Sequence, residues 1–169
     1  PQYLEAMKQI NDELVLTPGV DRAWVKSLWT PGVRWMEVTE EGFRGGPVMP
    51  NGYDGTPRHV EQLKQNIARS GIVGSLVAGN FKSSMILVPL LDTDPGTGKR
   101  FDYQGFSRVL EEKIRAKYEL AKNVDKPAAA GEFPNIKVHV IGFAKLIGEL
   151  IDGLFRVALY FAFAAAVAA

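Results

Sequence analysis

Residues 142–169 read GFAKLIGELIDGLFRVALYFAFAAAVAA and carry the strongest pattern in the chain. Lys145, Glu149, Asp152 and Arg156 follow one another at intervals of four, three and four residues, so on a helix they form one polar stripe. After Arg156 no charged residue appears, and the helix would be apolar on every side. The pattern therefore predicts a helix with one wet face that leaves water near Arg156.

The periodicity leaves the setting of this helix open. Residues 157–169 are too few to cross a bilayer alone, since a span takes about 20 residues. Entry into a membrane, packing in a protein core and a position at the membrane surface all remain, although a surface helix should carry further basic residues after Arg156. The chain starts at Pro1 and ends inside the apolar run, so we expect it to be part of a longer protein.

Composition excludes several classes of function. The 169 residues suffice for one domain with a core or for two small lobes. A net charge of +1, from 20 basic and 19 acidic residues, disfavours binding to nucleic acid. The absence of cysteine removes disulfides, zinc–thiolate sites and a cysteine nucleophile. The N-terminal segment has acidic residues and no apolar core, so it does not read as a signal peptide.

Helical and extended patterns alternate before residue 142. Apolar residues at helical spacing predict helices, and runs rich in β-branched and aromatic residues between Gly or Pro turns predict strands. The expected helices cover 4–14, 57–70 and 103–118, and the expected strands cover 20–29, 33–41, 72–78, 81–91 and 136–140. Residues 42–55 are expected to be a loop with an extended core, and 122–134 a linker. Helices over one face of a mostly antiparallel sheet give an α+β fold.

The chain shows no convincing catalytic or metal-binding motif. The segment PGTGKR at 95–100 lacks the first glycine and the final Ser or Thr of a phosphate-binding loop, so it reads as a solvated turn. His59 and His139 have no second ligand at metal-binding spacing and read as structural histidines. Neither pair of adjacent glutamates, 40–41 or 111–112, resembles an acid–base dyad. We therefore expect no catalytic residue, metal or cofactor, and no enzymatic activity.

Aromatic residues are crowded in one part of the sequence. Three tryptophans, Trp24, Trp29 and Trp35, lie within a short stretch with Met36 and Phe43 nearby. Packing in a core is the ordinary explanation for such residues. If they are exposed, they form a contact surface for a hydrophobic ligand or for a neighbouring lobe.

Several segments in order resemble one family. They are GVDRAWVKSLWTPGVRWMEVTEEGF at 19–43, PVMP at 47–50, TPRHVEQLKQNIARSGIVGSLV at 56–77, SSMILVPLL at 83–91 and IKVHVIGFAKLIGELIDGL at 136–154. Together they are similar to the first periplasmic loop of resistance-nodulation-division exporters, in the MMPL-like branch related to Patched-type and hopanoid or lipid transporters. The resemblance covers nearly the whole chain and rests on the order of elements, because no single short motif is diagnostic.

The resemblance implies a ferredoxin-like split βαβ porter subdomain at 1–141, truncated before its first strand, and a helix at 142–169 leading into a transmembrane segment. Arg156 and Tyr160 would lie at the membrane interface, on the periplasmic side of a bacterial inner membrane. The resemblance favours membrane entry over the core alternative. It also implies proton-driven export of hydrophobic or amphiphilic, lipid-like molecules.

The implied partners are a lipid or similar small molecule, the membrane, the remainder of the transporter chain and possible further copies of the chain. The residues that would carry protons lie outside this sequence. Contact of Trp29, Trp35, Met36 and Phe43 with substrate is inferred from their chemistry alone. The alternative is a stand-alone periplasmic or membrane-anchored domain that binds a hydrophobic ligand or a protein partner.

Overall fold

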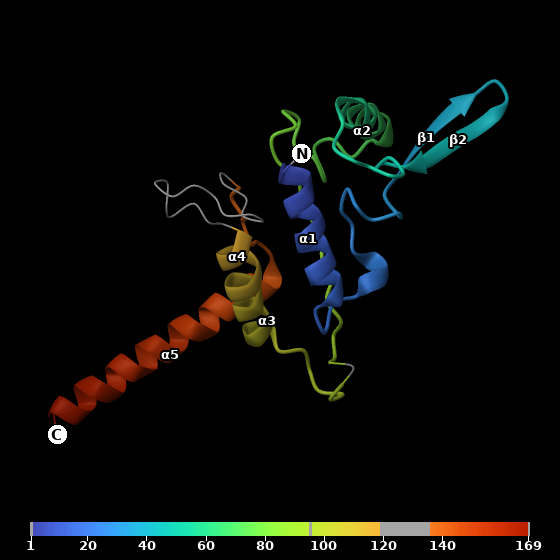
Figure 1. The fold of residues 1–169 in the computed structure, drawn as a ribbon. Coiled ribbons are helices and arrows are strands. Elements are labelled where there is room, and N and C mark those ends of the chain that lie inside the picture. Colours follow the sequence, from blue (N-terminus) through green and yellow to red (C-terminus); the bar gives the residue numbers. More distant parts are fainter. Residues whose placement is uncertain (1, 95, 119–135, 169) are drawn as a thin grey trace, which may run out of the picture. The chain divides into compact units, whose positions relative to one another are not determined.

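The computed structural model describes residues 2–94, 96–118 and 136–168, and the chain separates into two compact units, Pro1–Pro95 and Gly96–Ala169 (Figure 1). Helices are combined with a two-stranded antiparallel sheet, so the predicted α+β class is confirmed. This sheet is the only one in the described ranges, and the larger sheet of a ferredoxin-like split βαβ unit is not confirmed. The boundary predicted between residues 141 and 142 separates a domain in water from a helix that leads into a membrane, and it stays a prediction.

The predicted helices are all present. In the first unit, α1 covers Gln2–Leu16 and α2 covers Pro57–Ser70. The Thr56 side chain accepts a hydrogen bond from the backbone N–H of His59, and Gly71 ends α2 with a left-handed φ of 71°. In the second unit, α3 (Tyr103–Val109), the π-helical turn η2 (Leu110–Arg115) and α4 (Ala116–Tyr118) follow without a break, and α5 covers Phe143–Ala168.

The sheet is a hairpin of β1 (Arg34–Thr39) and β2 (Gly42–Pro47), which extends away from α1 and α2 within the first unit (Figure 1). It confirms the strand predicted at 33–41, and β2 is a paired strand in the first part of the segment predicted at 42–55 as a loop with an extended core. The glycines that indicated a loop instead give room to the neighbouring strand. A Cβ on Gly45 would lie 2.7 Å from the Trp35 carbonyl oxygen and 3.0 Å from the Met36 Cγ, and Gly42 has a φ of 124° at the turn.

The strands predicted at 20–29 and 81–91 are wrong as regular strands. The two segments do run antiparallel, through isolated bridges that join Val20 to Leu90 and Lys26 to Leu87. Between these bridges the 3₁₀ turn η1 (Arg22–Trp24) interrupts the pairing. Pro89 has no N–H to donate, and its carbonyl accepts a 2.9 Å hydrogen bond from the N–H of Asp21.

The hairpin predicted from 72–78 and 81–91 is present in part. The Phe81 N–H donates to the Ala78 carbonyl over 2.8 Å across the expected Gly79-Asn80 turn, and an antiparallel bridge joins Val77 to Ser84, but no regular strand extends from it. Residues 136–140 form no strand. The linker predicted at 122–134 lies outside the described residues.

The first unit has a hydrophobic core between α1, α2 and the connecting segments. Two hydrogen bonds between buried polar groups connect its segments. The Ser27 hydroxyl donates to Asn11 over 2.7 Å, and the Asn66 side chain donates to the Val48 carbonyl over 2.9 Å. Both bonds satisfy groups that would otherwise be buried without a partner. The core cluster consists of Met7, Leu28, Val33, Val48, Met49, Leu63, Ile67, Leu76 and Val77.

Candidate membrane helix and exposed apolar surfaces

The polar stripe of α5 packs against a neighbouring helix. The Lys145 ammonium lies 2.5 Å from a carboxylate oxygen of Glu111 and 3.1 Å from one of Glu149. One turn further, Asp152 accepts hydrogen bonds from Gln104 over 2.6 Å and from Arg108 over 3.2 Å. The prediction of a wet stripe was therefore wrong in part, because Lys145 and Asp152 bind α3 and η2.

Gly148 lets the two helices approach closely. An ideal Cβ at this position would lie 2.5 Å from the Cβ of Ser107, and both residues are buried. Beside this contact the ring of Tyr103 packs edge-on against Phe143, with 5.4 Å between ring centroids. The two helices run antiparallel, because Gln104, Ser107 and Glu111 meet Asp152, Gly148 and Lys145 in reverse order.

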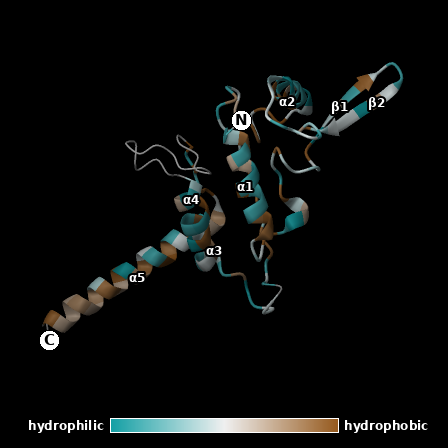
Figure 2. Ribbon diagram, viewed as in Figure 1, coloured by the Kyte–Doolittle hydropathy of each residue, from teal (hydrophilic) through white to brown (hydrophobic). Residues whose placement is uncertain are grey.

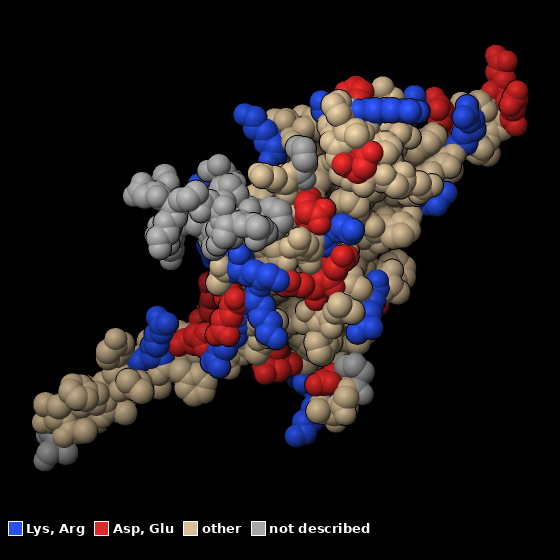
Figure 3. Space-filling model, viewed as in Figure 1, with Lys and Arg blue, Asp and Glu red and all other residues tan. Residues whose placement is uncertain are grey.

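The ion pairs keep their groups charged. Lys145 donates a hydrogen bond to Glu111 and lowers the pKa of that carboxyl below its usual value of 4.5, and Arg115 adds a smaller effect in the same direction. Glu111 lies on the π-helical turn η2, where one extra residue widens the helix. Charged side chains gather along this part of the second unit (Figure 3).

The apolar sides of α5 face outward. Leu150 is 60% exposed, Leu154 is 70% exposed and Phe161 is 75% exposed. Every side chain from residue 157 to 167 is exposed, and no charged group follows Arg156 (Figures 2 and 3). Over Phe143–Val167 the helix has the length and composition of a membrane span, and no part of its most apolar 18-residue stretch is buried. Tyr160 lies one turn beyond Arg156 and is 71% exposed.

The four residues predicted to contact substrate do not form one cluster. Trp29 is half-buried against the core of the first unit, where its indole N–H donates to the Leu4 carbonyl over 3.0 Å. Trp35 is half-buried on one face of the hairpin, with the Arg69 guanidinium 5.5 Å from its ring. Met36 and Phe43 lie on the opposite face, 71% and 79% exposed.

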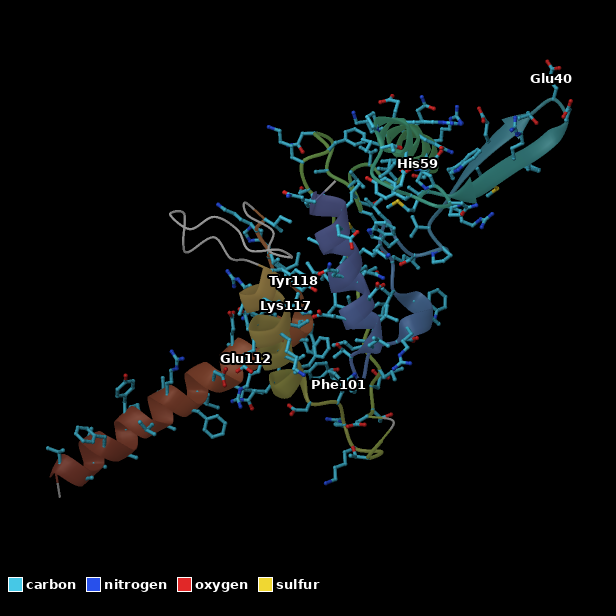
Figure 4. All side chains as sticks on the ribbon, in the orientation of Figure 1. Glu40, His59, Phe101, Glu112, Lys117 and Tyr118 are labelled. Carbon is cyan, nitrogen blue, oxygen red and sulfur yellow. The ribbon has the colours of Figure 1, made fainter. Side chains whose placement is uncertain are left out.

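Val38 completes this exposed face and was missed in the sequence. It pairs with Phe43 across the hairpin and is 76% exposed, whereas Met36 pairs with Gly45. The signal was the alternation of Met36 and Val38 in the predicted strand, which places both on one face. The two-residue turn at the tip carries Glu40 (Figure 4).

His59 is held in a local structural contact. Its Nδ1 lies 2.6 Å from a carboxylate oxygen of Asp54, and its ring stacks on Tyr53. Hydrogen bonding to Thr56 is the main cause that lowers the Asp54 pKa to about 2. The Tyr53 hydroxyl is buried without a hydrogen-bonding partner, and burial raises its pKa. The described residues contain no cluster of three metal-binding side chains.

Comparison with protein-family models, with characterised proteins and with solved structures gives no match to this chain.

Proposed function

We propose that the chain is a membrane-attached porter domain of a proton-driven exporter of hydrophobic or amphiphilic molecules, with α5 as the helix that enters the bilayer. The observation that carries the proposal is the exposed apolar surface of α5 after Arg156. A soluble domain rarely leaves so large an apolar surface uncovered. In a bilayer the same surface is in its preferred solvent.

The dimensions of α5 suit this placement. Its 26 residues give a length of about 39 Å at about 1.5 Å per residue, which exceeds the roughly 30 Å thickness of a hydrocarbon core. If the polar stripe lies at headgroup depth, residues 157–169 reach about 20 Å into the membrane. Arg156 and Tyr160 then lie at the interface, where basic and aromatic side chains are favoured.

The export function rests on the resemblance to resistance-nodulation-division proteins. In this proposal the first unit belongs to a ferredoxin-like porter subdomain on the periplasmic side of a bacterial inner membrane, completed by strands from elsewhere in the transporter. Two features support it: the α+β class, and the order in which a helix next to the domain becomes apolar on every side. The exposed hairpin face of Met36, Val38 and Phe43 is compatible with contact to a neighbouring porter domain or to an amphiphilic substrate.

Membrane entry can be tested with single cysteines, because the chain has none of its own. An environment-sensitive fluorophore at Phe163→Cys should shift to the blue when the 169-residue chain is reconstituted in vesicles, and lipids brominated on their acyl chains should quench it. The matched control is Lys99→Cys on an exposed loop of the same unit, which should stay in water. Equal, solvent-like emission at both positions would refute membrane entry.

The export function needs a separate experiment on the bacterium that carries the gene. Deletion of the gene should lead to retention of an amphiphilic lipid in the inner membrane, and the parent gene should encode further apolar spans on both sides of this segment. A parent gene without such spans would contradict the proposal. In that case the exposed hairpin face favours the alternative, an anchored binding domain for a hydrophobic ligand or protein partner.

A further inference from the structure

Within the described residues, Arg156 and Glu149 are the two groups of the polar stripe that bind no group of α3 or η2. Glu149 uses one carboxylate oxygen, on Lys145, and the charge of Arg156 acts on Asp152, one turn back along α5. The register explains why Arg156 meets no group of α3 in the described residues. Asp152 already meets Gln104, near the first residue of α3, so Arg156 lies one turn beyond the end of the neighbouring helix.

Both groups border one shallow polar depression. It is lined by side chains of η2 and α5, including Arg115, Lys145, Glu149 and Arg156, and Gly153 leaves its α5 side open, with nothing within 4 Å of a Cβ placed there. The cations and carboxylates that line it are equal in number. A depression of this kind suits a ligand that carries both charges better than a simple anion.

The two groups lie in a defined order along the helix axis. Arg156 follows Glu149 by seven residues, two turns on the same face, which is about 10.5 Å of axial rise. Arg156 is therefore nearer the apolar end of α5 and Glu149 nearer the water. A guanidinium binds a phosphate with two parallel hydrogen bonds, and a carboxylate accepts hydrogen bonds from a primary ammonium.

We propose that this depression binds the headgroup of a phospholipid whose primary ammonium is two carbons from its phosphate, as in phosphatidylethanolamine. The phosphate binds Arg156, the ammonium binds Glu149, and the acyl chains lie along the exposed apolar residues that follow Arg156. The order of Glu149 and Arg156 along α5 matches a lipid in the leaflet that α5 enters, because in that leaflet the phosphate lies deeper than the ammonium. The proposal rests on membrane entry of α5.

The choice of lipid separates this binding from general electrostatic attraction. A cationic surface would prefer anionic phosphatidylglycerol. The proposed site instead prefers phosphatidylethanolamine, because phosphatidylglycerol has no cation for Glu149 and the methylated ammonium of phosphatidylcholine has no N–H to donate. Flotation of the 169-residue chain with vesicles of phosphatidylcholine, alone or mixed with either lipid, measures this ranking.

Two variants and a control test the residues. Arg156→Gln and Glu149→Gln should each lower the apparent affinity for phosphatidylethanolamine vesicles by roughly tenfold, about the value of one charge-assisted hydrogen bond. Glu149→Gln should leave binding to pure phosphatidylcholine unchanged, because the methylated ammonium does not donate to Glu149, whereas Arg156→Gln should lower it as well, because phosphatidylcholine carries the same phosphate. Glu112→Gln is the matched control, since this exposed carboxylate on η2 does not line the depression (Figure 4). Excess glycerophosphoethanolamine should abolish the preference, whereas inorganic phosphate should not.

The fluorophore at Phe163→Cys is recorded in the same vesicles. A blue shift in all lipids without a preference for phosphatidylethanolamine would overturn the headgroup site and leave membrane entry intact. No blue shift in any lipid would refute membrane entry itself. A preference for phosphatidylglycerol, or loss of affinity in Glu112→Gln equal to that in the two test variants, would also overturn the site.

Discussion

Gly148→Ala should loosen the contact between α3 and α5, whereas Gly153→Ala should not. A Cβ at Gly148 would lie 2.5 Å from the Ser107 Cβ and 2.7 Å from its hydroxyl oxygen, while ordinary contacts begin at 3.4 Å. The helices must therefore separate by roughly 1 Å, and overpacking of this kind costs about 1–3 kcal/mol. A Cβ at Gly153 meets nothing within 4 Å.

The comparison of the two variants cancels the effect of helix propensity. Each replaces a helical glycine by alanine, which favours the helix by about 1 kcal/mol. The difference between them is then the clash alone, about 1–3 kcal/mol, or roughly a 5- to 150-fold difference in the opening constant of α3. Amide hydrogen exchange of residues 103–109, measured by mass spectrometry on the 169-residue chain in detergent, reports this constant directly.

A second substitution tests the cause. Ser107→Gly removes the atoms that the new Cβ would meet, so Gly148→Ala should have little effect on α3 exchange in a Ser107→Gly background. The non-additivity measures the coupling of the two positions. Equal exchange in Gly148→Ala and Gly153→Ala, or an unchanged effect in the Ser107→Gly background, would refute the close approach of α3 and α5.

Three further predictions concern both units. Asn66→Ala should lower the free energy of unfolding of the first unit by about 1–3 kcal/mol, because it leaves the Val48 carbonyl buried without a donor; denaturant titration by tryptophan fluorescence measures this, with exposed Gln65→Ala as the control. The depressed pKa of Glu111 stabilises the second unit at pH values above 4.5, and this stability should fall as the pH drops below 4.5 towards the folded-state pKa. The opening constant of α3, obtained from amide exchange corrected for the pH dependence of the intrinsic exchange rate, should therefore rise there in the wild type and less in Glu111→Gln. Truncation after Arg156 should leave the fluorescence melting curve of the first unit unchanged, since all three tryptophans lie in that unit; a large shift would show that the removed segment is core.

The sequence was a good guide to the helices and a poor one to the strands. Helical spacing, the Thr56 cap and Gly71 are local signals, and α2 forms where they indicate. Pairing of strands depends on distant partners. Residues 20–29 have strand composition, yet η1 interrupts their pairing with 87–91, and no local signal distinguishes these outcomes. Gly45 misled in the other direction, because it makes room for the Trp35 carbonyl and the Met36 side chain of β1.

Candidate site residues were predictable to the extent that their surroundings are local. The sequence located Arg156 and Tyr160 on one helix, but it missed Val38, which the alternation with Met36 places on the same face of a strand. It grouped Trp29 and Trp35 with Phe43, although the structure separates them, because closeness in sequence does not determine which face a side chain takes. The hydrogen bond of Trp29 to Leu4 crosses from one segment to another and leaves no trace in local composition.

The partner of the α5 stripe did leave a signal in the sequence. Gln104, Arg108, Glu111 and Arg115 are spaced by four, three and four residues, the same intervals as in the stripe of α5. Equal spacing lets the two stripes meet as an antiparallel helix pair, in which Lys145 binds Glu111 and Asp152 binds Arg108. When the polar face of α5 binds α3 and η2, the opposite, apolar side of α5 points outward, whereas Phe106, Ile114 and Tyr118 on the neighbouring helix are buried. The outward position of Leu150 and Leu154 therefore follows from the same pairing that binds Asp152, and it is the arrangement expected of helices whose solvent is lipid.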